Sequence, residues 1–181
     1  MFCLKLLPAG LAAAVAALIA GSGYAEEFSA RLNGFNEIGP LSGPTGAILT
    51  DATGTVRLDL DKEATPPKIA YTLTYTAGFT SPVTVAHIHF GKVHVAGGVI
   101  AFFCGGGGKP ACPNPSGSVS GVITGSDVVG PTAQNVTPGD FDALEDALTS
   151  NTAYANVHTM KFPAGEIRGQ VRKVDREDRE D

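Results

Sequence analysis

Short stretches in which apolar and polar residues alternate, separated by clusters of glycine and proline, recur along this chain. The stretch from Tyr71 to Phe79 is the clearest, because Tyr71, Leu73 and Tyr75 alternate with threonines. Successive side chains of a β-strand point to opposite faces, so this alternation predicts an antiparallel strand with one buried face. Comparable stretches lie at residues 28–32, 54–60, 83–90, 98–103, 117–123, 154–159 and 165–171. About eight short strands at this spacing predict an all-β fold, an antiparallel Greek-key-like sandwich or partly closed barrel.

One segment departs from this alternation and predicts a single short helix. Its apolar residues recur at helical spacing, at Phe141, Leu144, Ala147 and Leu148. Thr137 and Pro138 precede them, which predicts Thr137 as the N-cap and Pro138 as the first helical residue. We expect about ten helical residues, ending near Asn151 and packing across one end of the sandwich.

The two ends of the chain differ in composition from the middle. Residues 1–25 carry one charge, Lys5, ahead of an apolar run and of small residues, the pattern of a cleaved secretory signal peptide. Residues 26–172 are predicted to form one domain, and the almost wholly charged residues 173–181 a disordered tail. No later stretch reaches membrane-spanning length, so we expect a secreted or periplasmic protein without a transmembrane segment in its mature chain.

The charge balance of the expected mature chain is acidic. Without Lys5, 12 basic and 18 acidic residues remain, a formal net charge of −6. This balance argues against nucleic acid as a partner, because phosphate binding requires a basic surface.

Apart from Cys3 in the predicted signal peptide, the chain has two cysteines, Cys104 and Cys112, which lie in the segment CGGGGKPAC. In an oxidising compartment a pair this close predicts a disulfide that closes a small glycine-rich loop. Such a bridge would contribute about 2–3 kcal/mol by constraining the unfolded chain. A two-thiolate metal site is the alternative, although CxxC spacing is absent and further ligands would have to come from elsewhere.

The strongest functional signal is a pair of histidine segments far apart in the sequence, AHIHFG and NVHT. His87 and His89 share one face of an extended strand, and His158 faces outward from another. If the two strands are neighbours, three imidazoles converge on the outer face of the sheet, where they would bind copper or zinc. The alternative is that these histidines are structural, each bonded to a nearby carbonyl or carboxylate.

Three further residues are candidates for supporting this site. Asn156 has the same strand parity as His158, and Glu166 lies on the polar face of the returning strand, so either would orient an imidazole through its second nitrogen. Glu166 with Arg168 is alternatively a surface ion pair worth under about 1 kcal/mol. His94, in the loop after AHIHFG, is a candidate additional ligand or a solvent-facing loop residue.

These segments resemble the CHRD domain, the module repeated in chordin and common as a single secreted domain in bacteria. The resemblance covers about residues 28–172 and includes FSARLNGFNEIGP, TGTVRLDL, AHIH and PAGEIRGQV, with Leu32, Gly34, Glu37 and Pro40 in the opening motif. It implies a secreted binding module that acts through protein or surface contacts, with an extracellular or envelope protein as its partner. The loop FGKVHVAGG departs from the Gly-Pro-rich loop of the family, so His94 is not a family residue.

The predicted sandwich is also similar to that of copper/zinc superoxide dismutase. There, too, a His-x-His strand and a distant histidine hold copper on the outside of the sheet. The similarity extends to His87, His89 and His158 and not to the zinc loop. A copper-dependent redox enzyme is therefore the alternative to a binding module without catalytic residues, and metal storage or sensing at the cell envelope is a third hypothesis.

Overall fold

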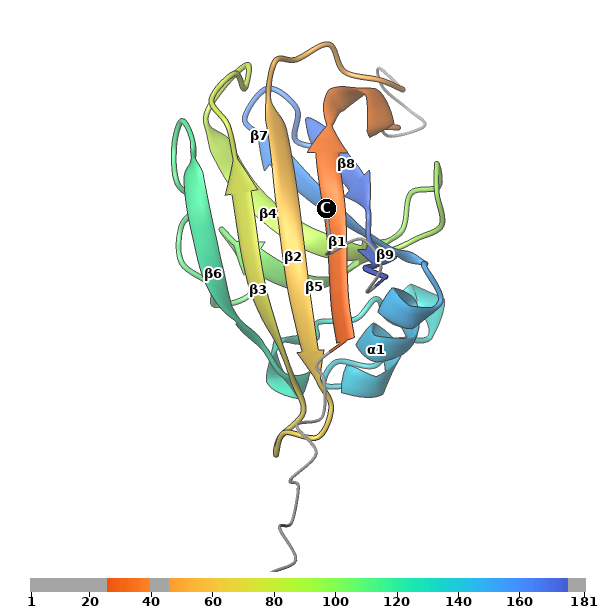
Figure 1. Cartoon of the computed structure of the whole chain (residues 1–181). Helices are drawn as coiled ribbons and strands as arrows, with labels where there is room; N and C mark the ends of the chain where they lie inside the picture. The colour runs from red at the N-terminus through yellow and green to blue at the C-terminus, as the bar shows by residue number, and fades with distance from the viewer. Residues whose placement is uncertain (1–25, 40–45, 176–181) are drawn as a thin grey trace, which may run out of the picture.

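Antiparallel strands form a nearly closed barrel in the computed structural model, which describes residues 26–39 and 46–175 (Figure 1). The strands are β1 (Glu26–Asn33), β2 (Thr53–Asp61), β3 (Lys68–Tyr75), β4 (Val83–Phe90), β5 (Gly98–Cys104), β6 (Gly117–Ile123), β7 (Ala153–Thr159), β8 (Ile167–Gln170) and β9 (Arg172–Lys173). Their order is β5-β4-β7-β8-β1-β2-β3-β6, with β9 beside β1, so several neighbours are distant in sequence. The predicted all-β fold with eight main strands is confirmed.

The alternation of apolar and polar residues places the core between two layers of strands. In Figure 1, β6, β3, β2 and β1 form one layer in front of β4, β5, β7 and β8. On β3 the side chains of Ile69, Tyr71, Leu73 and Tyr75 are buried. Burying a side chain such as Leu73 contributes about 1.5–3 kcal/mol, and this gain selects the register of the strand, since a one-residue slip would expose the whole set.

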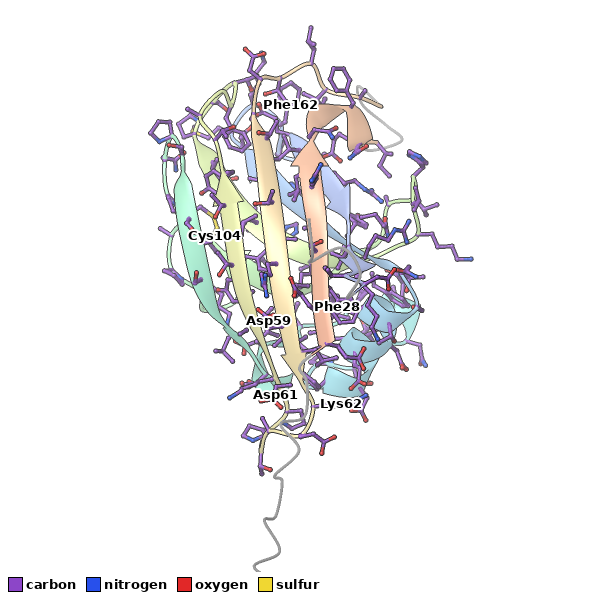
Figure 2. All side chains as sticks on the ribbon, in the orientation of Figure 1. Phe28, Asp59, Asp61, Lys62, Cys104 and Phe162 are labelled. Atoms are coloured by element: carbon purple, nitrogen blue, oxygen red, sulfur yellow. A yellow bond between two sulfur atoms is a disulfide. The ribbon has the colours of Figure 1, made fainter. Side chains whose placement is uncertain are left out.

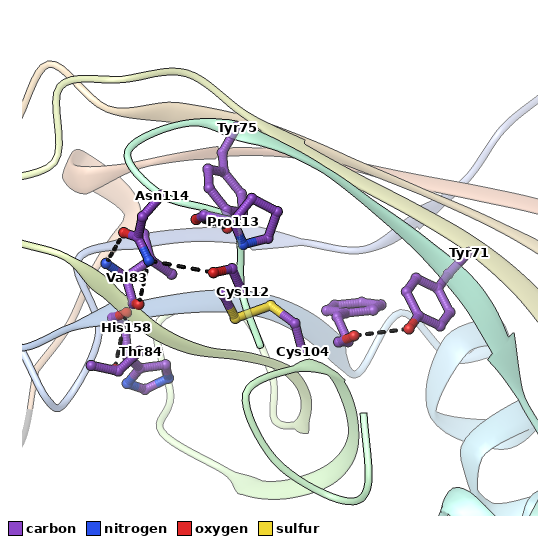
Figure 3. Close-up of a disulfide and its surroundings, with 10 residues drawn as sticks. Tyr71, Tyr75, Val83, Thr84, Cys104, Cys112, Pro113, Asn114 and His158 are labelled. Atoms are coloured by element: carbon purple, nitrogen blue, oxygen red, sulfur yellow. Dashed lines mark hydrogen bonds between the residues drawn. A yellow bond between two sulfur atoms is a disulfide. The ribbon is translucent and has the colours of Figure 1, made fainter. Parts of the chain in front are cut away.

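The predicted disulfide between Cys104 and Cys112 is present, at the end of β5 (Figure 3). Asn114 follows it and bonds both backbone groups of Val83, with Oδ1 accepting from the amide and Nδ2 donating to the carbonyl. The bridge ties the loop between β5 and β6 to the end of β5, and the Asn114 amide ties it to the start of β4. The loop is therefore fixed beside the strand that carries His87.

A hydrogen bond between buried groups also joins the two layers where the barrel closes. The hydroxyl of Tyr71 on β3, which Figure 3 labels, donates to the Phe103 carbonyl on β5 at 2.8 Å, and the two rings pack with centroids 5.1 Å apart. A buried hydroxyl without such a partner would cost about 1–3 kcal/mol, so this pair favours closure.

The helix α1 (Phe141–Thr149) begins later than the sequence predicts. Asp140 is the N-cap instead of Thr137, and its carboxylate accepts a hydrogen bond from the Ala143 amide at 3.0 Å. Gly139 has a φ of +95°, outside the helical region, so Pro138 belongs to the preceding turn. The predicted apolar face is buried as expected: Phe141, Leu144, Ala147 and Leu148.

The helix packs at one end of the barrel, beside β1 and β9 (Figure 1). Lys62, labelled at the lower end of β2 in Figure 2, lies 3.5 Å from Glu26 of β1 and 3.4 Å from Glu145 of α1. Half of the Lys62 side chain is exposed, so each ion pair contributes little to stability. Burial of the apolar helix face is the larger contribution.

The start of the predicted tail belongs to the sheet. Lys173 of β9 pairs with Phe28 of β1, and the Val174 amide donates to the Glu27 carbonyl at 2.9 Å. The prediction of disorder from residue 173 onward is wrong for these residues, because their backbone groups find partners on β1. Residues 176–181 lie outside the described residues.

The predicted signal peptide, residues 1–25, also lies outside the described residues. Within residues 26–39 and 46–175, no helix has both the length and the apolar character needed to cross a membrane.

Candidate metal centre

β4 and β7 are neighbours, as the sequence hypothesis requires, and they bring the three histidines together. In their antiparallel pairing, His87 lies opposite Asn156, His89 opposite Tyr154, and His158 opposite Val85. The His87 ring centroid is 4.4 Å from that of His89 and 4.4 Å from that of His158. One nitrogen from each of the three rings lies within 4.8 Å of the other two. The structure thus places all three predicted residues in one cluster.

The cluster is covered, although its strand parity points away from the core. His87, His89 and His158 are 6, 8 and 6% exposed. The Phe102 ring packs edge-on against His87 at 5.3 Å, and the Tyr154 ring stacks on His89 at 4.5 Å, only 5° from parallel. The prediction of an outward-facing cluster was right about parity and wrong about exposure, because strand parity does not describe the aromatic side chains that cover the rings.

Backbone carbonyls orient two of the imidazoles. His89 Nδ1 lies 2.8 Å from the Gly97 carbonyl oxygen, and His158 Nδ1 lies 3.0 Å from that of Pro163. A carbonyl oxygen only accepts, so each Nδ1 carries the proton and each Nε2 presents a lone pair. A purely structural role, in which each histidine bonds a nearby carbonyl, therefore explains the Nδ1 atoms of His89 and His158.

Three other imidazole nitrogens are buried without a hydrogen-bond partner among the described residues. They are His87 Nδ1, His89 Nε2 and His158 Nε2. Leaving a polar group buried and unpaired costs about 1–3 kcal/mol, and a structural role gives no reason to gather three of them. A metal ion accepts lone pairs of this kind, and second-nitrogen bonds to carbonyls are typical of metal-binding histidines.

The environment keeps the rings in the neutral form that binds metal. Burial lowers the pKa of His87 to about 2, with a further contribution from the neighbouring imidazoles. Burial lowers the pKa of His89 to about 4, against the opposing effect of the bond to Gly97, and burial also lowers the pKa of His158. Neutral lone pairs are therefore available at neutral pH.

The spacing of the nitrogens is close to that of a bound ion. Two nitrogens at about 2.0–2.1 Å from a tetrahedral ion are about 3.4 Å apart. The nitrogens that the three rings bring together, one from each ring and no more than 4.8 Å apart, would have to approach one another by at most about 1.4 Å, which small side-chain rotations supply. Imidazole nitrogen suits copper and zinc, so the donor set fits the predicted ions.

Asn156 and Glu166, predicted to orient the imidazoles, are hydrogen-bonded elsewhere. Asn156 Nδ2 donates to Glu37 Oε2 at 2.7 Å and to the Ile167 carbonyl at 2.9 Å. The Glu166 carboxylate is fully buried and accepts from threonines, namely Thr50, Thr80 and Thr159. The carbonyls of Gly97 and Pro163 take the orienting role instead.

His94 is exposed at the tip of the loop between β4 and β5 and is not part of the cluster. The loop is held by Arg168, whose Nη2 donates to the carbonyls of Lys92 at 3.2 Å and Val95 at 3.0 Å. Arg168 is 2% exposed, so the alternative of a surface ion pair between it and Glu166 is wrong.

Among the residues that border His89, sequence reasoning gave Tyr154 no role and considered Arg168 only as an ion-pair partner of Glu166. The guanidinium carbon of Arg168 lies 3.4 Å from the centre of the Tyr154 ring, which itself stacks on His89. These residues, with the buried Glu37 and Asn156, line a cavity of about 200 Å³. Tyr154 and His158 are an even number of residues apart on β7, so the alternation along this strand could have placed Tyr154 on the histidine face.

The fold is an all-β domain, and its disulfide is typical of proteins of oxidising compartments. A family model described as the CHRD domain matches residues 28–171, most of the chain. The chain therefore belongs to the CHRD family. No curated protein and no solved structure matches it. The similarity to superoxide dismutase accordingly stays a prediction.

Proposed function

We propose that this protein is an exported CHRD module that binds one copper or zinc ion through His87 Nδ1, His89 Nε2 and His158 Nε2. One observation carries the proposal, namely that the three histidines each bring a nitrogen within 4.8 Å of the other two, and that each also has a buried ring nitrogen without a hydrogen-bond partner among the described residues. Their lowered pKa values and the carbonyls behind two of the rings support it.

Elemental analysis of the protein purified without a histidine tag tests this proposal. After loading and dialysis, we expect about one equivalent of copper or zinc in the wild type, and none in His87→Ala/His158→Ala. His94→Ala is the matched control, because it removes an exposed imidazole outside the cluster, and it should retain the metal. Less than about a tenth of an equivalent in the wild type would end the proposal.

Competition between the two ions tests the choice of metal. Copper(II) binds nitrogen ligands more tightly than zinc, so copper should displace zinc when the two are supplied together. Retention of zinc in the presence of equimolar copper would assign the site to zinc and contradict the redox alternative.

The module is proposed to act through contacts with an extracellular or envelope protein. Family membership supports this part of the proposal, since the CHRD domain is an extracellular module. Cross-linking of the tagged full-length protein in the export compartment, followed by capture, should recover a partner above the level of an unrelated exported protein. Recovery of nothing above that background would remove the binding role and leave metal binding untouched.

A copper-dependent redox enzyme is the second candidate. It is favoured by the small number of histidine ligands, three, which leaves a coordination position free, and by the cavity beside His89. In superoxide disproportionation, two superoxide ions and two protons would give dioxygen and hydrogen peroxide. Copper-loaded wild type should exceed the rate of an equal amount of copper with His158→Ala. Equal rates would contradict the enzyme hypothesis. Metal binding would still be tested separately, by the elemental analysis.

A further inference from the structure

A second candidate site lies beside the metal centre, between two buried side chains of opposite charge. Glu37 and Arg168, 4% and 2% exposed, both line the cavity of about 200 Å³, together with His89, Tyr154 and Asn156. Among the ion pairs of the described residues, none joins Glu37 to Arg168. Charges buried without direct pairing are costly, so the cavity is suited to a ligand that contacts both of them.

Arg168 is held in place with donors to spare. Its Nη2 donates to two loop carbonyls, of Lys92 and Val95, and its flat face lies on the Tyr154 ring. A guanidinium has five N–H donors, and those on Nε and Nη1 make no hydrogen bond with the described residues. Because these contacts already immobilise the Arg168 guanidinium, it loses little conformational entropy when it binds a planar oxyanion.

The Glu37 carboxylate is also held in place by hydrogen bonds, and its oxygens can still accept further ones. Oε1 accepts from the Ile38 amide at 3.2 Å, and Oε2 accepts from Asn156 Nδ2 at 2.7 Å. Each carboxylate oxygen has two lone pairs, so one acceptor position remains on each. A Cβ at Gly165 would lie 2.5 Å from Oε2, so the glycine leaves room for this arrangement. Burial raises the pKa of Glu37, as expected where polar compensation is incomplete.

We propose that this cavity binds a small oxyanion that carries its own hydroxyl group, such as hydrogencarbonate or glycolate. The guanidinium of Arg168 donates to the oxyanion, and the ligand hydroxyl donates to the carboxylate of Glu37. A doubly charged anion such as sulfate is disfavoured, because the charge of Glu37 offsets that of Arg168. At about 30 Å³ per liquid water molecule, the cavity of about 200 Å³ has room for about six heavy atoms, more than the four of hydrogencarbonate or the five of glycolate. The site does not require a bound metal.

Calorimetric titration of the metal-free full-length protein tests this inference with sodium glycolate as the probe. Acetate, which lacks the hydroxyl, and sulfate are the comparison anions. We expect glycolate to bind at least about tenfold more tightly than acetate, and sulfate not to bind, since one charge-assisted hydrogen bond is worth a factor of this size. Equal affinity for glycolate and acetate would overturn the proposal. So would the absence of glycolate binding at about 50 mM, because a dissociation constant above that concentration corresponds to less than about 2 kcal/mol of binding free energy.

Two variants assign the contacts. Arg168→Gln should weaken glycolate binding at least about tenfold through loss of the charged donors. Glu37→Gln removes the negative charge without changing the shape, so acetate should bind more tightly and the preference for glycolate should fall below about threefold. Because Arg168 also holds the β4–β5 loop, Glu37→Gln keeps the test decisive if Arg168→Gln does not fold. A preference unchanged in Glu37→Gln would refute the assigned contact.

Two controls distinguish binding in this cavity from anion binding at exposed arginines and from binding at the metal centre. Arg57→Gln removes an arginine whose side chain is 58% exposed and which does not line the cavity, and it should bind glycolate like the wild type. His87→Ala/His158→Ala should also bind glycolate normally while losing metal. Loss of glycolate binding in that double variant would show that the anion depends on the imidazoles and would contradict an independent site.

Discussion

Acid should destabilise the metal-free protein through the histidine cluster. An ordinary histidine titrates near pH 6.5, whereas burial lowers the pKa of His87 to about 2 and that of His89 to about 4 in the folded protein. The folded values are depressed, so the unfolded chain takes up protons at a pH where the folded chain does not. The stabilisation present above pH 6.5 is therefore lost as the pH falls toward 4 for His89 and toward 2 for His87.

The size of this loss follows from the depth of burial. For each histidine with a lowered pKa, the free energy of unfolding falls by about 1.4 kcal/mol for every pH unit below 6.5. Between pH 7 and pH 5 the loss is therefore about 2 kcal/mol per histidine. The rings of His87 and His89 interact, so we expect about 2–4 kcal/mol for the pair rather than a strict sum. A domain of this size is typically stable by about 5–15 kcal/mol, so the loss is a measurable share.

Urea unfolding at pH 7 and pH 5, after metal has been removed with a chelator, measures this loss. His87→Gln should lose about 2 kcal/mol less than the wild type, and the exposed His94→Gln should behave like the wild type. Glu37, whose pKa burial raises, shifts stability in the opposite direction, but it is present in every variant and cancels in the comparison. An equal loss in His87→Gln and the wild type would refute the reasoning.

Two further changes test the packing around the site. Gly165→Ala should lower the free energy of unfolding by about 2–4 kcal/mol, because φ is +128° and the new Cβ would lie 2.5 Å from Glu37 Oε2. Gly139→Ala, with φ of +95° and nothing within 4 Å, should cost about 1 kcal/mol by urea unfolding; equal costs would contradict the steric argument. Cys104→Ala/Cys112→Ala should lower the unfolding free energy by about 2–3 kcal/mol and make the urea midpoint insensitive to reductant, and a midpoint equal to that of the wild type would contradict a stabilising bridge.

Local patterns in the sequence were sufficient for the strands and for the shared face of His87 and His89, but not for the pairing that brings His158 beside them. The period of two along β3 predicts its buried face, because each inward residue gains from burial whichever strand lies opposite. The same parity puts His87 and His89 on one face, and their meeting with His158 required only that β4 and β7 be neighbours.

Contacts between distant segments account for the errors. The position of Asn156 predicted a bond to a histidine, but Glu37, more than a hundred residues earlier, competes for its amide. The turn that Gly139 makes, with its positive φ, displaced the helix start from Thr137 to Asp140. Strand parity carries no information about loops, so the carbonyls that orient the imidazoles could not be assigned in advance.

X-ray absorption of the metal-loaded protein is the sharpest test of the histidine site, because it reports the atoms bound to the ion. We predict one copper or zinc ion with three imidazole nitrogens at about 2.0–2.1 Å. A first coordination sphere of oxygen atoms, or one without the multiple-scattering signature of imidazole, would contradict this prediction.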